Sequence, residues 1–267
     1  MKFRLLNEGI TYDGKNFRIN PFENSDKDII HIAEPYIEET KFDNKAYYFG
    51  YRFTENASSK IKSKFIHWIK FLEDNKPEEF IVEHLIALPL DELNRRVNLS
   101  TISCTLSPRS NRSPLVTLMR RCINNVIPRN AKRSFELIKN LPQNVEFDWE
   151  HFDNEYESEI GDKRYKAIRD HIDNELIPKI KNLDYFSIAA NVKPKYRNYI
   201  KNYLKFENEA EQSAFEAMNG GNILIYDDIN TSGATLREIL RIVRVLAPDS
   251  KIFIFTLIGN MREGDAA

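Results

Sequence analysis

The stretch that decides the fold is Asn222-Ile223-Leu224-Ile225-Tyr226-Asp227-Asp228-Ile229-Asn230-Thr231-Ser232-Gly233-Ala234-Thr235. Its four consecutive apolar residues, Ile223 to Tyr226, predict a buried strand of a parallel sheet, because a half-exposed strand would alternate apolar and polar residues. Two adjacent carboxylates and a turn rich in hydroxyl groups follow directly. The stretch therefore predicts a strand that leads acidic side chains into a polar turn.

The residues after this turn continue the pattern of an α/β fold. Apolar residues recur at spacings of three and four and predict an amphipathic helix: Leu236, Ile239, Leu240, Val243 and Leu246. Pro248-Asp249-Ser250 ends this helix, and a second apolar run, Ile252 to Ile258, predicts the next strand. A strand, a helix and a strand in this order form a parallel crossover. The turn at 229–235 is therefore expected at the carboxyl edge of the sheet, where open α/β folds bind ligands.

The turn has the chemistry of a phosphate-binding site. The free N–H groups at the start of the helix are donors for phosphate oxygens, and Gly233 permits a close approach of the backbone. Hydroxyl donors stand beside them on Thr231, Ser232 and Thr235. Asp227 and Asp228 are acceptors when ionised, which suits neighbouring ribose hydroxyls and not a phosphate that they would repel. The turn thus predicts a ribose 5-phosphate site, the alternative being that the acidic pair only caps a helix.

This stretch resembles the loop that binds phosphoribosyl diphosphate (PRPP) in type I phosphoribosyltransferases. The resemblance implies that Asp227 and Asp228 hold the ribose hydroxyls and act in catalysis. It also implies that the 5-phosphate is held by Thr231, Ser232, Gly233, Ala234 and Thr235. Tyr226 and Asn230 depart from the commonest form of the loop, which has aliphatic residues there, but neither supplies a proposed contact. The implied fold is α/β with a central, mainly parallel sheet.

A first strand, a pyrophosphate-binding turn and a helix are expected earlier in a chain of this family. Residues 101–106, the turn 107–112 and a helix at 113–126 fit that order. Ser107, Ser110 and the backbone amides would hold pyrophosphate oxygens, while Arg109 or Arg112 would neutralise them. The alternative is a solvated basic turn. A competing assignment uses 85–89 as the first strand and 91–96 as the turn, although acidic residues there suit pyrophosphate poorly.

The second strand is predicted at 135–138, and a long insertion follows at about 140–221, with a helix around 163–180. In the family the corresponding connection is a flap that closes over the reaction. Three cations stand close together beside Pro194: Lys193, Lys195 and Arg197. Lys193 and Arg197 are expected to act in catalysis by steadying the departing pyrophosphate, and closure would exclude water. The alternative is the exposed basic start of a helix.

The chain is expected to have two parts, a mixed amino-terminal lobe (1–98) and a phosphoribosyltransferase-like core (99–267). Within the lobe, the sequence predicts a hairpin at 9–19, a strand at 46–53 and a helix at 58–72. The carboxyl-terminal end resembles the short ComF branch of the family, whose zinc ribbon is absent because only two cysteines occur. The lobe is therefore expected to form the hood that covers the acceptor.

Composition limits the partners. The net charge is −1, with 39 basic and 40 acidic residues, which argues against non-specific electrostatic binding of nucleic acid. No apolar run approaches the length of a membrane span, and Cys104 and Cys122 are expected to be buried thiols in a reducing compartment, so a cytoplasmic protein is expected. The histidines are scattered, and no metal site made by the protein alone is expected. The resemblance implies Mg²⁺ as an ion carried by PRPP. It also implies a possible homodimer, because members of the family often dimerise.

The resulting function is a phosphoribosyltransferase of nucleotide metabolism, a glycosyltransferase that moves ribose 5-phosphate from PRPP to a nitrogenous acceptor with release of pyrophosphate. The acceptor is open. Members that salvage oxopurines carry an Asp as candidate base where Thr231 stands here, which argues against hypoxanthine or guanine. The alternative function is a sensor or regulator that binds PRPP or a nucleotide without turnover.

Overall fold

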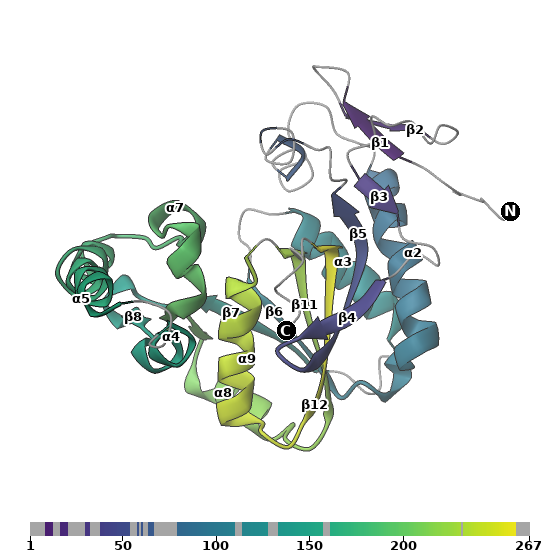
Figure 1. Ribbon diagram of the computed structural model, residues 1–267. Coiled ribbons are helices and arrows are strands. Elements are labelled where there is room, and N and C mark those ends of the chain that lie inside the picture. Colours follow the sequence, from purple (N-terminus) through teal and green to yellow (C-terminus); the bar gives the residue numbers. More distant parts are fainter. Residues whose placement is uncertain are drawn as a thin grey trace, which may run out of the picture.

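The computed structural model of the chain describes residues 9–12, 17–20, 30–32, 38–53, 58, 60, 64–66, 79–109, 114–127, 133–156, 161–230 and 232–259. They form an α/β fold around one large sheet, with helices on both faces (Figure 1). The strand order is β10-β7-β6-β11-β12-β5-β3-β1-β2, with β4 paired to β5. The central strands β7, β6, β11, β12 and β5 run parallel. The predicted α/β class with a central, mainly parallel sheet is confirmed.

Two strand–helix–strand units make the parallel centre. The first comprises β6 (Cys104–Pro108), α3 (Pro114–Val126) and β7 (Arg133–Lys139). The second comprises β11 (Asn222–Asn230), α9 (Ala234–Leu246) and β12 (Lys251–Gly259). The elements predicted for both units are confirmed, with one shift. The first strand begins at Cys104 and not at Thr101, because Leu99–Thr101 forms a 3₁₀ turn.

Strand β11 is buried on both faces. Ile223 and Ile225 belong to the apolar cluster beneath α9, while Leu224 and Tyr226 belong to the cluster beneath α3 and α2 (Glu79–Val97). All four side chains are fully buried. Because successive residues of a strand point to opposite faces, a strand covered by helices on both sides needs an unbroken apolar run, which is what the sequence has.

The amino-terminal strands extend the same sheet. β5 (Lys45–Phe53), the strand predicted at 46–53, pairs in parallel with β12. Antiparallel strands follow it: β4 (Glu38–Phe42), β3 (Ile30–Ile32), β1 (Gly9–Tyr12) and β2 (Phe17–Asn20). β1 and β2 confirm the predicted hairpin, whose turn lies outside the described residues. The predicted boundary after residue 98 therefore passes through a shared sheet, and most of the helix predicted at 58–72 lies outside the described residues.

The competing assignment for the first strand is wrong. Residues 85–89 lie inside helix α2 (Glu79–Val97), and the residues that would have made its turn lie in the last turns of that helix. There the charged side chains form ion pairs one turn apart, from Arg95 to Asp91 at 2.5 Å and from Arg96 to Glu92 at 3.1 Å.

Among the described residues, no helix is both long and apolar enough to cross a membrane.

The insertion after β7 is a folded, mainly helical unit. Its helices are α4 (Trp149–Tyr156), α5 (Asp162–His171), α6 (Ile177–Lys181), α7 (Ile188–Asn191) and α8 (Glu209–Glu216), and a 3₁₀ turn spans Pro194–Tyr199. A π-helical turn at Ile172–Leu176 joins α5 to α6, so the helix predicted around 163–180 is confirmed. The short strands β8 (Glu146–Phe147) and β9 (Ile200–Lys201) pair together, while β10 (Leu204–Phe206) returns to the large sheet beside β7.

Candidate functional site

A cavity of about 280 Å³ lies at the carboxyl edge of the sheet, between the ends of β6 and β11. From these two neighbouring strands the chain continues in opposite directions, from β6 to β7 and from β11 to β12. The order β7-β6-β11-β12 thus makes this edge a topological switch point, the place where open parallel sheets bind their ligands. The predicted turn after β11 forms one wall of the cavity.

Asp227 and Asp228 line the cavity and are largely buried, at 8% and 4% exposure. They belong to β11, which continues beyond the predicted strand to Asn230. The Asp227 carboxylate accepts the backbone N–H of Asp228 at 2.9 Å, and the Asp228 carboxylate accepts that of Ile229 at 2.7 Å. These bonds fix the orientation of both side chains at the edge of the sheet.

The start of α9 forms the wall beside the two carboxylates. Ser232, Gly233, Ala234 and Thr235 all line the cavity, while Thr231 lies outside the described residues. The N–H of Arg237 makes the first helical bond, to the carbonyl of Gly233. The N–H groups of Ala234 to Leu236 precede it and have no acceptor within the helix, so they are available to an anion.

Gly233 has a structural requirement of its own. Its φ of +76° lies in the left-handed region, and a Cβ atom there would lie 2.7 Å from the ring of Phe42. The close approach that glycine allows is therefore to a side chain of the amino-terminal strand β4. Phe42 is itself buried, so the ring has little room to move away.

Of the predicted pyrophosphate turn at 107–112, the structure describes residues 107–109, and Pro108 and Arg109 line the cavity. Ser107 is fully buried on β6 and is not among the lining residues. Within the described part of the chain the Ser107 hydroxyl has no hydrogen-bond partner. Ser110 and Arg112 lie outside the described residues.

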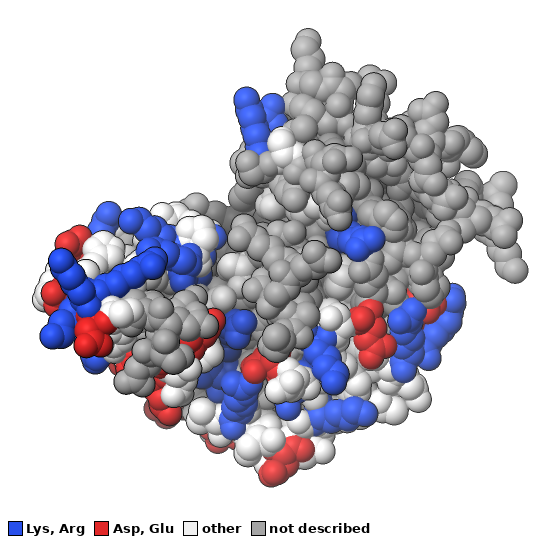
Figure 2. All heavy atoms as spheres, in the orientation of Figure 1, with Lys and Arg blue, Asp and Glu red and all other residues white. Residues whose placement is uncertain are grey.

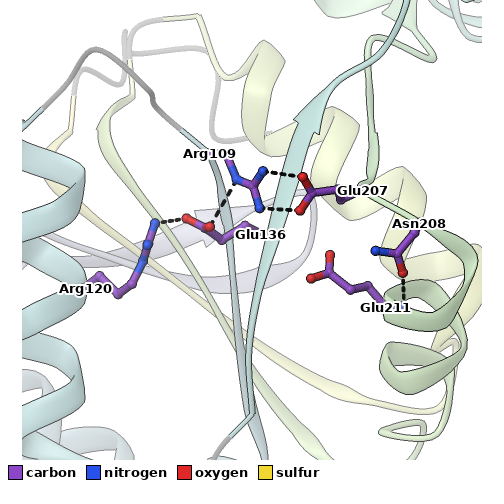
Figure 3. A network of polar contacts seen from close by, with 6 residues as sticks. All are labelled: Arg109, Arg120, Glu136, Glu207, Asn208 and Glu211. Carbon is purple, nitrogen blue, oxygen red and sulfur yellow. Dashed lines mark hydrogen bonds and ion pairs between the residues drawn. The ribbon is translucent and has the colours of Figure 1, made fainter.

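Arg109 is held by carboxylates of its own chain (Figure 3). Its two Nη atoms donate to Glu207 at 3.0 and 2.7 Å, and its Nε donates to Glu136 at 3.2 Å. Glu136 is shared with Arg120. The hydrogen bonds from Arg109 lower the pKa of Glu207, and those from Glu207 raise the pKa of Arg109. An incoming pyrophosphate would have to compete with Glu207 for this guanidinium.

Of the two cations of the insertion that the sequence predicts to act in catalysis, one lines the cavity and the other does not. Arg197 lines the cavity, with its guanidinium donating to the carbonyls of Val192 at 2.9 Å and Ala189 at 2.8 Å. Lys193 is not among the lining residues. A lysine that the sequence did not single out, Lys139 at the end of β7, does line the cavity, and its ammonium group donates to the Phe186 carbonyl at 3.0 Å.

Comparisons with known proteins leave the family open. No protein-family model matches the chain, and no curated protein matches it. Among solved structures, the chain is similar to a hypoxanthine phosphoribosyltransferase from Staphylococcus aureus, with a TM-score of 0.36 and 8% sequence identity. That similarity covers 73% of this chain and 71% of the other. The function is therefore inferred from the site itself.

Side chains of the amino-terminal strands surround the loop, and the sequence did not predict these contacts. The Tyr47 hydroxyl bonds to Thr256 at 2.7 Å and accepts the amide of Asn230 at 3.3 Å, so Asn230 is held from β5. Phe42 packs on Gly233, and Ile66 lines the cavity. Phe42, Tyr47 and Ile66 of the predicted lobe thus lie beside the loop or the cavity.

Buried phenols also surround the site. Burial raises the pKa of Tyr47 to about 12, against the lowering effect of Thr256 and Asn230. Tyr203, which lines the cavity, has a pKa raised well above its ordinary value by burial and by the carboxylates Glu238 and Asp227. Both hydroxyls therefore stay protonated and remain hydrogen-bonding groups at neutral pH.

Tyr47 should make stability depend on pH in alkaline solution. The unfolded chain loses this phenol proton near pH 10 and the folded chain near pH 12, so the contribution is intact below pH 10 and is lost on approach to pH 12. Within this window Tyr47 contributes a loss of about 1 kcal/mol per pH unit. Urea unfolding across the window should show a shallower decline for Tyr47→Phe than for the wild type. The exposed Tyr185→Phe serves as control and should follow the wild type.

The donor set at the cavity suits Mg²⁺ only as an ion shared with a ligand. Among the described residues, no group of three or more His, Cys, Asp or Glu side chains could hold a metal ion by itself. Asp227 and Asp228 are two carboxylates at one wall, and Mg²⁺ commonly binds through one or two carboxylates together with phosphate oxygens and water. The residues present fit an ion carried by PRPP.

Proposed function

We propose that this chain transfers ribose 5-phosphate from PRPP to a nitrogenous acceptor. The observation that carries the proposal is the meeting of Asp227 and Asp228 with the residues Ser232 to Thr235 in one cavity at the switch point of the sheet. The carboxylates, which can accept hydrogen bonds from sugar hydroxyls, then stand beside groups that can donate hydrogen bonds to a phosphate. A sugar phosphate presents the complementary groups.

The 5-phosphate would bind at the start of α9. The N–H groups of the first helical turn and the positive end of the helix dipole favour an anion there. Hydroxyl groups of Ser232 and Thr235 add donors at the same wall. Asp227 and Asp228 would accept hydrogen bonds from the ribose hydroxyls, and their anchored orientation lowers the entropic cost of binding.

In the reaction, the bond from the ribose anomeric carbon to pyrophosphate breaks and a bond to the acceptor nitrogen forms. The pyrophosphate leaves with the bonding electrons, and the acceptor loses a proton to solvent or to a base. Arg109, Arg197 and Lys139 stand around the cavity and would stabilise the departing charge. When bound, Mg²⁺ would neutralise the pyrophosphate oxygens.

A second function is favoured by one observation. Arg109 is already bound by Glu207 and Glu136, and Arg197 by backbone carbonyls, so these two of the cations expected for pyrophosphate are engaged. A protein that senses PRPP or a nucleotide without turnover needs the ribose 5-phosphate site but no ready leaving-group site. The two functions therefore differ in what happens to these cations after the ligand binds.

Substitution of Glu207 probes this competition. Glu207→Gln removes the charge that holds Arg109, so affinity for inorganic pyrophosphate should increase by about threefold, the scale of a competing exposed ion pair. Isothermal titration calorimetry measures the change. Glu209→Gln, an exposed glutamate two residues further along, is the control and should leave the affinity as it is. A Glu207→Gln protein that binds pyrophosphate no better than the control would disprove the competition.

The enzyme is tested by incubating the protein with PRPP, Mg²⁺ and a panel of nitrogenous bases while following pyrophosphate release. Release that depends on one base and is lost in Asp227→Asn/Asp228→Asn is the expected result. PRPP binding without release for any acceptor would instead support the sensor. Absence of PRPP binding would contradict both the transferase and a sensor of PRPP.

A further inference from the structure

A second cavity, of about 140 Å³, lies against α9 and shares no lining residue with the first. Its walls come from α9, from the segment 198–201 and from Asp43, Asp148 and His151. Neighbouring residues of α9 separate the two cavities, since Leu236 lines the first and Arg237 lines the second. Figure 2 shows Lys and Arg side chains gathered over the face of α9.

Three of the four cations in this cavity have a carboxylate partner. Arg241 donates two hydrogen bonds to Glu238, at 2.8 and 3.0 Å. Arg244 pairs with Asp43, and the Lys201 ammonium group lies 3.5 Å from the Asp148 carboxylate. His151, at the rim, has its Nε2 3.9 Å from a Glu155 oxygen. Within the part of the chain that the structure describes, these pairs leave one lining cation without an ion-pair partner.

That cation is Arg237. Within the described residues it has no ion pair, and its Nε is buried without a hydrogen-bond partner. One contact holds the guanidinium in place, because its carbon lies 5.3 Å from the centre of the Phe42 ring. A buried donor without an acceptor is uncommon in folded proteins, and a bound ion is one way in which such a donor is satisfied.

An unpaired acceptor stands in the same cavity. The side-chain oxygen of Asn198 is buried and also lacks a partner within the described residues. A ligand that satisfies both groups must offer an anionic oxygen to Arg237 and an O–H or N–H to Asn198. Spare donors on Lys201 and Arg241 add to the attraction for an anion.

We propose that this second cavity binds a small phosphate ligand, either inorganic phosphate or a phosphate monoester that carries a hydroxyl group. Arg237 would bind the phosphate oxygens, and Asn198 would accept a hydrogen bond from the hydroxyl. Hydrogen phosphate itself has both groups, whereas sulfate at neutral pH has no hydroxyl. The cavity should therefore prefer phosphate to sulfate.

The test is a titration of the full chain with inorganic phosphate at constant ionic strength, followed by ¹H–¹⁵N NMR. The side-chain amide of Asn198 reports the second cavity, and the backbone amide of Thr235 reports the first. In the wild type both signals should move, each along a saturable curve. The Asn198 curve should need about tenfold more phosphate in Arg237→Met, which removes one charged donor but keeps an apolar stem over Phe42.

Arg133→Met is the matched control, because Arg133 also stacks on a ring, that of Phe135 at 5.6 Å, and lines neither cavity. It should leave the Asn198 curve unchanged. An Asn198 signal that does not move, or that moves equally in Arg237→Met and wild type, would overturn the second site. Because Thr235 is read in the same spectra, failure of the second site is distinguished from failure of the first.

Discussion

Replacing Asp227 and Asp228 together by asparagine is expected to weaken PRPP binding at least about a hundredfold. Each carboxylate would lose one charge-assisted hydrogen bond to a ribose hydroxyl, worth about 1.5–3 kcal/mol, and two such losses sum to about 3–6 kcal/mol. Asparagine keeps an oxygen that can accept the backbone N–H groups of Asp228 and Ile229, so the edge of the strand should persist. Calorimetric titration with PRPP and Mg²⁺ measures the loss.

A control with two other aspartates distinguishes the effect of net charge on PRPP binding from the effect of losing the carboxylates at the cavity. Asp162 and Asp170 are exposed aspartates of α5 and line neither cavity. Asp162→Asn/Asp170→Asn changes the net charge equally and should bind PRPP as the wild type does. Equal weakening in both double variants would mean that Asp227 and Asp228 attract the ligand only through long-range charge, and the ribose contacts would have to be abandoned.

Gly233→Ala is expected to destabilise the fold by about 3 kcal/mol and to impair the loop at the same time. The left-handed φ of +76° costs an alanine about 1–2 kcal/mol. Overlap of the new Cβ with the buried Phe42 ring, 2.7 Å away, adds about 1–3 kcal/mol. Urea unfolding gives the stability, and PRPP affinity measured on the folded protein gives the effect on the site.

The two parts of this cost can be separated. Gly220 also has a positive φ, of +81°, but a Cβ there meets nothing within 4 Å. Gly220→Ala should therefore show the backbone cost alone, about 1–2 kcal/mol. Phe42→Leu combined with Gly233→Ala should recover part of the steric cost. Equal destabilisation by Gly220→Ala and Gly233→Ala would show that packing against Phe42 contributes nothing.

The part of the fold that could be predicted from the sequence is the part governed by local pattern. The apolar runs of β11 and β12 and the stripe of α9 lie within one short segment, and their lengths, flanking residues and spacing favour one type of element each. The cluster of Asp227, Asp228 and residues 232–235 follows from that segment alone. The helix of the insertion was also predictable because its periodicity is local.

What could not be predicted depends on contacts between distant residues. β5 pairs with β12 although some two hundred residues of chain separate them, and the sequence of neither strand indicates which strand it pairs with. The same holds for Tyr47, which reaches Asn230 and Thr256, and for Glu207, which binds Arg109. The role expected for Arg109 assumed a free guanidinium, whereas a carboxylate 98 positions away occupies it.

Lys139 and Arg237 illustrate a further limit. Both belong to elements whose patterns were recognised, yet one cation among 39 basic residues carries no local signal of its surroundings. Lys139 became a candidate because β7 ends at the cavity. Arg237 became one because its neighbours on α9 pair with carboxylates, while it has no ion pair among the residues that the structure describes. Such roles come from the tertiary arrangement of charges.

The account rests on a site that binds both the hydroxyls and the phosphate of ribose 5-phosphate. Calorimetry with ribose 5-phosphate and 2-deoxyribose 5-phosphate on the wild-type chain tests it most directly. Loss of one hydroxyl that a carboxylate accepts should weaken binding about tenfold or more, while the phosphate contacts stay the same. Equal affinity for the two sugars, or no binding of either, would contradict the ribose 5-phosphate site.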